Sequence, residues 1–539
     1  MLGLRAADRI GGDVVAESLV ALGADTVFGL PGVHALPIWE GMRSTPLRVL
    51  GFRQELNAAF AADGFARVTG RPTPLVVSTG PGALMTLGAL MESATAFVPV
   101  VVLSSQIDSA AIGKGRGELH ETPDQPSSFR HLVKWTGRAG SVDEIPEVLA
   151  EAWRRAGTAP SGPVYVEIPF DVLQAPAPGA LPGLDGSPQR LPLPPGEEIE
   201  AVAALLAAAE RPLIVAGGGA VRSGAGDLVL ELAERLGAPV ATTYTGKGAV
   251  PERHPLALGS TWDDRPFLDL VEDADLVLVV GSWLGYELTG SGTLKPRGTV
   301  VQIDAAPERL GLNLPATSLA GDARAVAAAL LEALPAGRPR GGAAQVAAVR
   351  ERIAGGLATQ GRELELGLLE TISSTLAPGM PAAWDSTILA YTAGWYLRAE
   401  DPAQFLYPAG SSTLGYGFPA ALGAAAALGK ALTVAGDGGF QYSVSELATA
   451  RQYDLDVALL LVDDGGYGIL REYQDGAGFP HAGVDLRHPD FVALAEAYGV
   501  PARRTTRAAV TADLAWALGV EGPAVVVLSE KLVTPAPAS

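Results

Sequence analysis

Two acidic turns in the C-terminal third have the residue types of a cation site. Asp437 follows a short apolar segment at 432–435, and Asp464 follows a second one at 457–462. Such segments predict buried strands, and the glycines beside each acid predict tight turns. In an open parallel sheet, the carboxyl ends of the strands form the edge where ligands bind. Carboxylate oxygens there suit Mg²⁺ or Ca²⁺, with the phosphates of a ligand completing the coordination. Each Asp-Gly pair alone is an ordinary turn, but the matched positions together favour a metal site.

Three further residues have side chains that could transfer protons. Glu55 begins a helix predicted over 55–67, where the helix dipole also favours an acidic residue for purely structural reasons. His34 and His120 lie in glycine-containing segments, and a histidine can move protons near neutral pH. A surface or hydrogen-bonded structural role is an equal alternative for both histidines.

The elements that must position these residues alternate between strand and helix along the chain. Predicted strands lie at 26–28, 48–51, 75–78, 100–103, 164–168, 213–215, 276–280, 300–303, 432–435 and 457–462. The alternation predicts an α/β protein with three doubly wound parallel-sheet domains, at residues 1–175, 197–335 and 355–530. Segments rich in proline and glycine at 176–196 and 336–342 predict linkers. The tail after Val533, rich in proline and alanine, is expected to fray.

Composition excludes several classes of protein. The chain has 539 residues, of which 48% are apolar, and a formal charge of −20. An acidic chain without basic clusters is a poor nucleic-acid binder, and no apolar run is long enough to span a bilayer. The first residues lack the apolar core of a signal peptide, and the absence of cysteine excludes disulfides and thiol catalysis. These features predict a cytoplasmic protein without a membrane or nucleic-acid partner.

Three motifs, in order along the chain, resemble those of thiamine-diphosphate (ThDP) enzymes. The segment RQELNAAFAADGFARVTGRP, around Glu55, resembles the one that carries the family's cofactor-activating glutamate. The segment at 411–420 resembles GxMGxGxPAA, and Gly436-Asp437-Gly438 with Asp463-Asp464 resembles the diphosphate signature that ends in Asn-Asn. Thr79-Gly80-Pro81-Gly82 resembles the turn beside the cofactor's pyrimidine. The resemblance covers essentially the whole chain and implies a pyrimidine domain, a middle domain and a diphosphate domain.

The resemblance implies a role for each matching residue. Asp437, Asp464 and the carbonyl of Gly466 would hold Mg²⁺, although Asp464 stands where the family has Asn and adds a negative charge. Glu55 would protonate the aminopyrimidine, and the bulky Leu414 would hold the two rings in a bent shape. His34 and His120 would face the mouth of the cofactor site as catalytic residues. The implied cofactor-binding residues are Glu55, Gly80, Pro81, Gly82, Ser412, Thr413, Leu414, Gly436, Asp437, Gly438, Gly439, Tyr467, Gly468 and Ile469.

The resemblance leaves three functions open. The first is decarboxylation of a 2-oxo acid followed by carboligation, as in acetolactate synthases, because the segment 469–474 resembles theirs. The second is decarboxylation alone, of a bulkier or guanidino 2-oxo acid, because LPGVHALPIWEG and GRGELHETPDQ resemble that subgroup. The third is a catalytically silent subunit with this fold, which Asp464 and Ser412 favour. Carboligation ranks first by a narrow margin.

The family also implies an assembly and a possible second cofactor. Its members build each active site from the first domain of one subunit and the third domain of another, so a homodimer or homotetramer is expected. FAD occupies the middle domain in biosynthetic acetolactate synthases. The matching run here, 281–287, lacks their arginines, which disfavours FAD.

Overall fold

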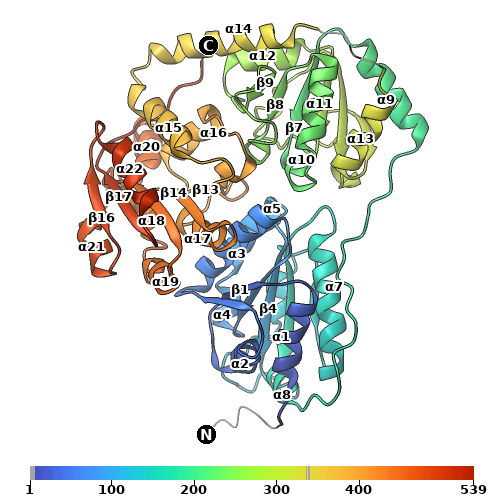
Figure 1. Ribbon diagram of the computed structural model, residues 1–539, viewed down its shortest axis with the longest axis vertical. Helices are drawn as coiled ribbons and strands as arrows, with labels where there is room; N and C mark the ends of the chain where they lie inside the picture. The colour runs from blue at the N-terminus through green and yellow to red at the C-terminus, as the bar shows by residue number, and fades with distance from the viewer. Residues whose placement is uncertain (1–6, 336, 338–339, 539) are drawn as a thin grey trace.

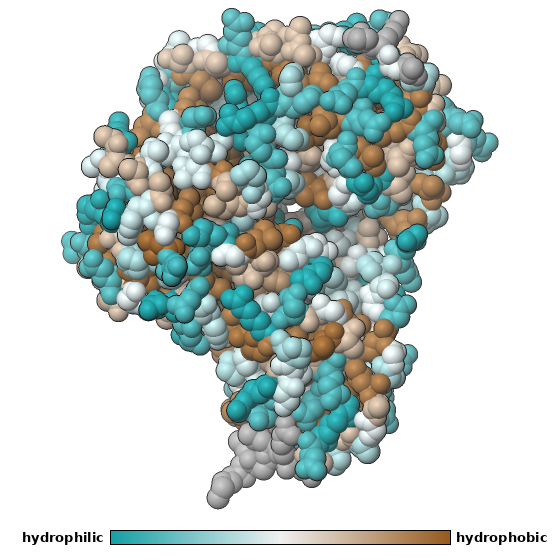
Figure 2. Space-filling view, viewed as in Figure 1, coloured by the Kyte–Doolittle hydropathy of each residue, from teal (hydrophilic) through white to brown (hydrophobic). Residues whose placement is uncertain are grey.

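Three parallel β-sheets, each covered by helices, make up the computed structural model (Figure 1). The structure describes residues 7–335, 337 and 340–538. All strand pairs in the three sheets are parallel, which confirms the predicted α/β class. The first domain forms a narrow lower lobe, and the other two form a broader upper part (Figures 1 and 2). Among the described residues, no helix has both the length and the apolar composition needed to cross a bilayer.

The first sheet has the strand order β2-β1-β3-β4-β6-β5. Its strands are β1 (Thr26–Gly29), β2 (Arg48–Gly51), β3 (Thr73–Val77), β4 (Val100–Gln106), β5 (Thr136–Arg138) and β6 (Val164–Pro169). The helices are α1 (Gly11–Ala21), α2 (Leu36–Met42), α3 (Glu55–Thr69), α4 (Pro81–Leu84), α5 (Leu87–Thr95), α6 (Gln125–Phe129), α7 (Ile145–Gly157) and α8 (Phe170–Gln174). The fully buried strands β3, β4 and β6 are rich in valine, leucine and isoleucine because helices cover both faces.

The second sheet has the order β12-β11-β10-β7-β8-β9. Its strands are β7 (Pro212–Ala216), β8 (Val240–Thr242), β9 (Ala257–Gly259), β10 (Leu276–Val280), β11 (Thr299–Asp304) and β12 (Thr317–Ala320). The helices are α9 (Gly196–Ala208), α10 (Gly218–Arg222), α11 (Gly226–Leu236), α12 (Arg265–Asp273), α13 (Ala323–Ala333) and α14 (Gly342–Ala358). Val346 and Ile353 of α14 join the hydrophobic core that contains Leu213 and Val277, so this helix belongs by its packing to the second domain.

The third sheet has the order β13-β14-β15-β17-β16. Its strands are β13 (Ala382–Trp384), β14 (Lys430–Gly436), β15 (Asp456–Val462), β16 (Ala502–Thr505) and β17 (Ala524–Leu528). The helices are α15 (Glu363–Thr375), α16 (Ile388–Tyr396), α17 (Gly417–Leu428), α18 (Asp437–Phe440), α19 (Glu446–Gln452), α20 (Gly468–Gly476), α21 (Phe491–Ala497) and α22 (Val510–Gly519). Asp437 begins directly after β14 and Asp463 directly after β15, so both acidic turns lie at one edge of the sheet.

Helices α3 and α17 pack closely and join the first domain to the third (Figure 1). A side chain on Gly64 would lie 2.2 Å from the Ala420 carbonyl oxygen, and one on Gly423 would lie 1.9 Å from that of Ala61. Only glycine permits this approach of the two backbones. The buried Tyr416 hydroxyl, 3.0 Å from the Asp63 carboxylate, adds a hydrogen bond across the same contact.

The segments between and after the domains differ in how much structure they form. Residues 177–195 form neither helix nor strand. The second predicted linker, 336–342, falls partly on residues 336, 338 and 339, which lie outside the described residues. The prediction of a frayed tail is wrong, because Ala538 is buried and its N–H donates to Asp264 at 2.5 Å. The tail donates backbone N–H groups to Glu472 of the third domain, to Gln360 and to Asp264 of the second domain, which proline and alanine content could not reveal.

Candidate active site

A cavity of about 230 Å³ lies at the carboxyl ends of β14 and β15. It is lined by Ser386, Thr387, Ile388, Tyr391, Ser412, Leu414, Gly436, Asp437, Gly438, Gly439, Val462, Asp464, Gly466, Tyr467, Gly468, Ile469, Leu470 and Leu532. The structure thus brings together most of the residues that the sequence singled out in the C-terminal third. Thr413 is not among the described lining residues; its hydroxyl donates to Ser411 Oγ at 2.8 Å.

The two carboxylates in this cavity have the electrostatics of a cation site. Asp437 is 1% exposed, and burial together with the Asp464 and Asp463 carboxylates raises the pKa of Asp437 to about 6. Burial likewise raises the pKa of Asp464. One oxygen of each carboxylate, Oδ2 of Asp437 and Oδ1 of Asp464, is buried and has no hydrogen-bond partner. Buried anionic oxygens without partners are costly, and a divalent cation supplies what they lack.

A histidine that the sequence did not single out lies behind the two turns. Nε2 of His488 is 2.9 Å from Oδ1 of Asp463 and 3.7 Å from Oδ2 of Asp437. The three side chains place one possible ligand atom each within 4.8 Å of one another. His488 lies about twenty residues beyond the turn, so no local spacing in the sequence indicated it.

Asp385 organises the loop that carries Leu414 and was also missed. It lies just after β13, is fully buried, and accepts the Gly415 N–H at 3.0 Å and the Ser386 N–H at 2.8 Å. A side chain on Gly439 would lie 2.9 Å from its Oδ1, so the carboxylate also packs against the Asp437 turn. Asp385 follows only three strand residues, too short an apolar run to predict a strand end.

A second group of the predicted residues gathers at the carboxyl edge of the first sheet. Glu55 begins α3, and its Oε1 lies 3.3 Å from the position that a side chain on Gly82 would take. Pro81 and Gly82 begin the short helix α4, and Gly80 precedes it with a φ of +65°. Burial raises the pKa of the Glu55 carboxyl. A carboxyl of raised pKa beside an open glycine turn can exchange a proton with a ligand that packs there.

His34 and His120 form a pair beside the same turn. Their ring centroids are 5.5 Å apart, and Nδ1 of each ring is buried without a hydrogen-bond partner. Cβ of His120 lies 2.8 Å from where a side chain on Gly80 would begin. Burial, and then the neighbouring His120, lower the pKa of His34, which favours its neutral form. The two residues come from separate segments, so the sequence could not predict their pairing.

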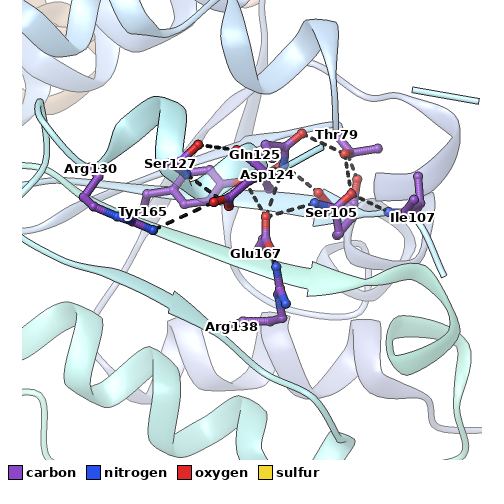
Figure 3. Close-up of polar contacts among 12 residues, drawn as sticks. Thr79, Ser105, Ile107, Asp124, Gln125, Ser127, Arg130, Arg138, Tyr165 and Glu167 are labelled. Atoms are coloured by element: carbon purple, nitrogen blue, oxygen red, sulfur yellow. Dashed lines mark hydrogen bonds and ion pairs between the residues drawn. The ribbon is translucent and has the colours of Figure 1, made fainter. Parts of the chain in front are cut away.

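A buried polar network supports the turn at Gly80 (Figure 3). Gln125 Oε1 accepts the Gly80 N–H at 2.6 Å, and its Nε2 donates to the Tyr165 hydroxyl at 2.5 Å. Tyr165 donates to Glu167, a fully buried carboxylate that also accepts from Arg138. Burial and the nearby Glu167 raise the pKa of Tyr165, so its hydroxyl stays protonated and donates. Buried networks with all partners present rigidify a structure, and this one fixes the turn relative to β6.

These two groups of residues are separate in the single chain. Every described residue that lines the cavity at Asp437 belongs to the third domain, whereas Glu55, Gly80, Pro81, Gly82, His34 and His120 lie in the first. Each group therefore presents its own face of a site.

A larger cavity, of about 880 Å³, lies at the amino ends of β7, β10 and β11 in the second domain. Its charged residues are paired with each other, for example Arg297 with Asp273 at 2.5 Å and Arg352 with Asp269 at 3.4 Å. Ligands of open parallel sheets bind at the opposite, carboxyl edge, so the site chemistry lies with the Asp437 cavity instead.

Comparison with known proteins agrees with this geometry. Models of the thiamine pyrophosphate enzymes match the N-terminal TPP binding domain at residues 9–128, the central domain at 199–330 and the C-terminal TPP binding domain at 387–528. The chain is 36% identical to the probable 2-ketoarginine decarboxylase AruI of Pseudomonas aeruginosa, over 92% of this chain and 89% of that protein. It is 32% identical to the probable acetolactate synthase large subunit of Methanocaldococcus jannaschii, over 92% and 87% of the two chains.

A third relative, the acetolactate synthase of Mycobacterium bovis, is 30% identical over 92% of this chain and 84% of its own. The domain matches, the three parallel sheets and these relatives agree. The chain therefore belongs to the thiamine pyrophosphate (thiamine diphosphate) enzyme family, in the group of acetolactate synthases and 2-oxo acid decarboxylases.

Proposed function

We propose that this protein is a ThDP- and Mg²⁺-dependent enzyme that decarboxylates a 2-oxo acid. The observation that carries the proposal is the pair of carboxylates, Asp437 and Asp464, at adjacent strand ends, each with a buried oxygen that lacks a hydrogen-bond partner. Mg²⁺ bound by these oxygens would join the acidic chain to an anionic diphosphate. The family supplies the cofactor, and the cavity supplies the ligands for its metal.

Each residue then has a defined task. Asp437, Asp464 and the carbonyl of Gly466 would hold Mg²⁺, while the backbone of the 436–439 turn would face the diphosphate. Leu414 would hold the cofactor in its reactive shape, a pre-organisation effect. Glu55 would hold a proton at the pyrimidine ring nitrogen. Bound ThDP supplies the carbanion and the electron sink that loss of CO₂ requires.

We infer that the complete site forms between two subunits. The residues around each half-site include exposed apolar side chains: Met85, Met91 and Leu119 in the first domain, and Leu470, Tyr473 and Phe479 after the Asp464 turn. Leu119 is 62% exposed and Phe479 is 65% exposed, fractions that are unfavourable for large apolar residues in water. A second copy of the chain would cover both groups and bring Glu55 of one subunit to Asp437 of the other.

The histidine pair favours release of an aldehyde as the outcome. After CO₂ leaves, the remaining carbon must either take up a proton or join a second carbonyl compound. His120, beside the Gly80 turn and next to the ring of His34, provides an unpartnered nitrogen that could deliver the proton. The relative at 36% identity bears the name of a 2-ketoarginine decarboxylase. A guanidino 2-oxo acid is therefore our first candidate substrate.

Carboligation to acetolactate is the second candidate function. It ranks first on sequence alone, because the segment 469–474 resembles that of acetolactate synthases, and two of the relatives above bear that name. The histidine pair places decarboxylation alone ahead of carboligation, because a ligating enzyme must keep protons away from the reacting carbon.

FAD does not fit this proposal. At the carboxyl edge of the second sheet, Arg222 donates to the Ala96 carbonyl at 2.9 Å, and Arg309 stacks between Phe97 and Trp283 at 4.7 and 4.1 Å. Arg222 is thus bonded to the first domain, and Arg309 is held between two aromatic rings. Neither arginine faces a flavin phosphate. We expect the purified protein to have no flavin absorbance.

The test of the proposed function is a product assay with 2-oxo-5-guanidinopentanoate and with pyruvate, in the presence of ThDP and Mg²⁺. Decarboxylation predicts CO₂ and an aldehyde from the guanidino substrate, with no activity in Asp437→Ala. Acetolactate from pyruvate would favour the second candidate. Calorimetry with ThDP and Mg²⁺ separates both from a silent subunit, because absence of binding would contradict the proposal altogether.

A further inference from the structure

Arg471 lies against the turn that carries Asp464. Its Nη1 donates to the Asp464 carbonyl oxygen at 3.1 Å and lies 3.9 Å from Oδ1 of the same residue. The side chains of Arg471 and Asp464 are 11% and 13% exposed. The ion pair is therefore largely shielded from solvent, where charges interact more strongly than at the surface.

We propose that Arg471 is the counter-charge of Asp464, which lets this chain use an aspartate where its family uses asparagine in the metal loop. The proposal rests on the proposed function. With Mg²⁺ bound to Asp437 and Asp464, the two carboxylates cancel the charge of the cation and repel a diphosphate. Arg471, which also pairs with the exposed Asp485 at 2.9 Å, would return part of the positive charge that an aspartate and an asparagine ligand would leave.

The backbone around the turn places the guanidinium where it can act on both partners. A side chain on Gly466 would lie 2.3 Å from Nη2 of Arg471, so the arginine packs directly on the residue whose carbonyl would hold Mg²⁺ in the proposed site. Nε of Arg471 pairs with Asp485 at 2.9 Å, and the Tyr467 N–H donates to the Val484 carbonyl at 2.9 Å. Arg471 is thus held by the Asp464 carbonyl and by Asp485.

Asp475, an acid on the same helix α20, serves as a control. It is 69% exposed and pairs with His481 at 3.0 Å. It does not line the cavity at Asp437, so its charge should not need Arg471 in order for a diphosphate to bind.

The test is a double-mutant cycle on Arg471→Gln and Asp464→Asn, measured by two binding constants. The Kd of Mn²⁺ without ThDP, from the EPR signal of the free ion, should fall about tenfold in Arg471→Gln, because an uncompensated carboxylate attracts the cation. The Kd of ThDP at saturating Mg²⁺ should rise about tenfold in the same variant. Combining Arg471→Gln with Asp464→Asn should return both constants to within about threefold of the wild type.

Further variants decide between charge and packing. Arg471→Lys keeps the charge and should bind ThDP within about threefold of the wild type. Asp475→Asn combined with Arg471→Gln should restore neither constant. Equal losses from Arg471→Gln in the wild-type protein and in the Asp464→Asn variant would overturn the proposal. If the wild-type protein binds Mn²⁺ but not ThDP, only the proposed function is contradicted, because the Mn²⁺ measurements still test the ion pair. If it binds neither Mn²⁺ nor ThDP, the proposed function and the role of Arg471 are both contradicted.

Discussion

The backbone N–H of Gly80 donates to Oε1 of Gln125 at 2.6 Å, and both residues are buried. Gly80 adopts a positive φ of +65°, which glycine tolerates without strain. Through Gln125 the turn is tied to Tyr165 and Glu167 on β6 (Figure 3). The turn that would face the cofactor in the proposed site is thus held in place by hydrogen bonds from outside that site.

Replacing Gln125 with alanine should loosen this turn. The Gly80 N–H and the Tyr165 hydroxyl would each lose a buried partner, at a cost of about 1–3 kcal/mol in stability. We expect kcat to fall about tenfold, since small misplacements of a site cost rate, with a smaller change in the KM for ThDP. Steady-state kinetics would measure both. As a control, Gln302→Ala removes a similarly buried glutamine from the second domain. It should leave both kcat and the KM for ThDP unchanged.

Replacing Glu55 with glutamine should remove the proton exchange with the cofactor. We expect activity to fall roughly 10²- to 10⁴-fold, the usual contribution of a general acid–base group, while ThDP still binds. Calorimetry would measure binding and a product assay would measure rate. Glu40→Gln, at an exposed acid on α2 paired with Arg43, is the control. A Glu55→Gln variant with near-normal turnover would show that another group activates the cofactor.

Titration of Asp385 should contribute to the pH dependence of the protein's stability. Burial raises the pKa of this carboxyl from 3.8 to about 6. The folded state therefore binds the proton more tightly than the unfolded state. The stabilisation is fully present below about pH 4 and is lost as the pH rises through about 6, a change of roughly 3 kcal/mol.

The Asp385→Asn variant has no carboxyl to titrate at this position, so its stability should depend less on pH. Thermal unfolding midpoints at pH 5 and pH 7.5 would measure the effect, because the wild-type midpoint should fall more over this range than that of the variant. The same change in midpoint for both proteins would mean that other groups account for the pH dependence. The variant should also weaken ThDP binding, since Asp385 holds the Gly415 N–H in the Leu414 loop.

Much of the fold could be predicted from the sequence, because buried parallel strands appear as short apolar runs between helices. Strands β1, β2, β4, β6 and β10 begin at the predicted residues. Strands β5, β8, β9 and β13 have only three residues each and give too little signal. Helix α19 begins only at Glu446, because the chain first makes turns at 441–445.

The site was predictable where its residues are close in sequence to a strand end. Asp437, Asp464 and Leu414 fall in recognisable motifs, and the structure places all three around one cavity. His488, Asp385 and Gln125 reach the site region by tertiary contacts across long stretches of chain, so no spacing or periodicity indicated them. The pairing of His34 with His120 is likewise a product of the fold alone.

The claim on which the account depends is that Glu55 of one subunit and Asp437 of another complete the same site. Complementation tests it directly: Glu55→Gln and Asp437→Ala, each inactive alone, are co-expressed and the mixed oligomers assayed. In a mixed dimer, one of the two sites has both native residues, so random assembly should restore about a quarter of wild-type activity. Mixed oligomers as inactive as either parent would show that the two residues act within one chain or not together at all.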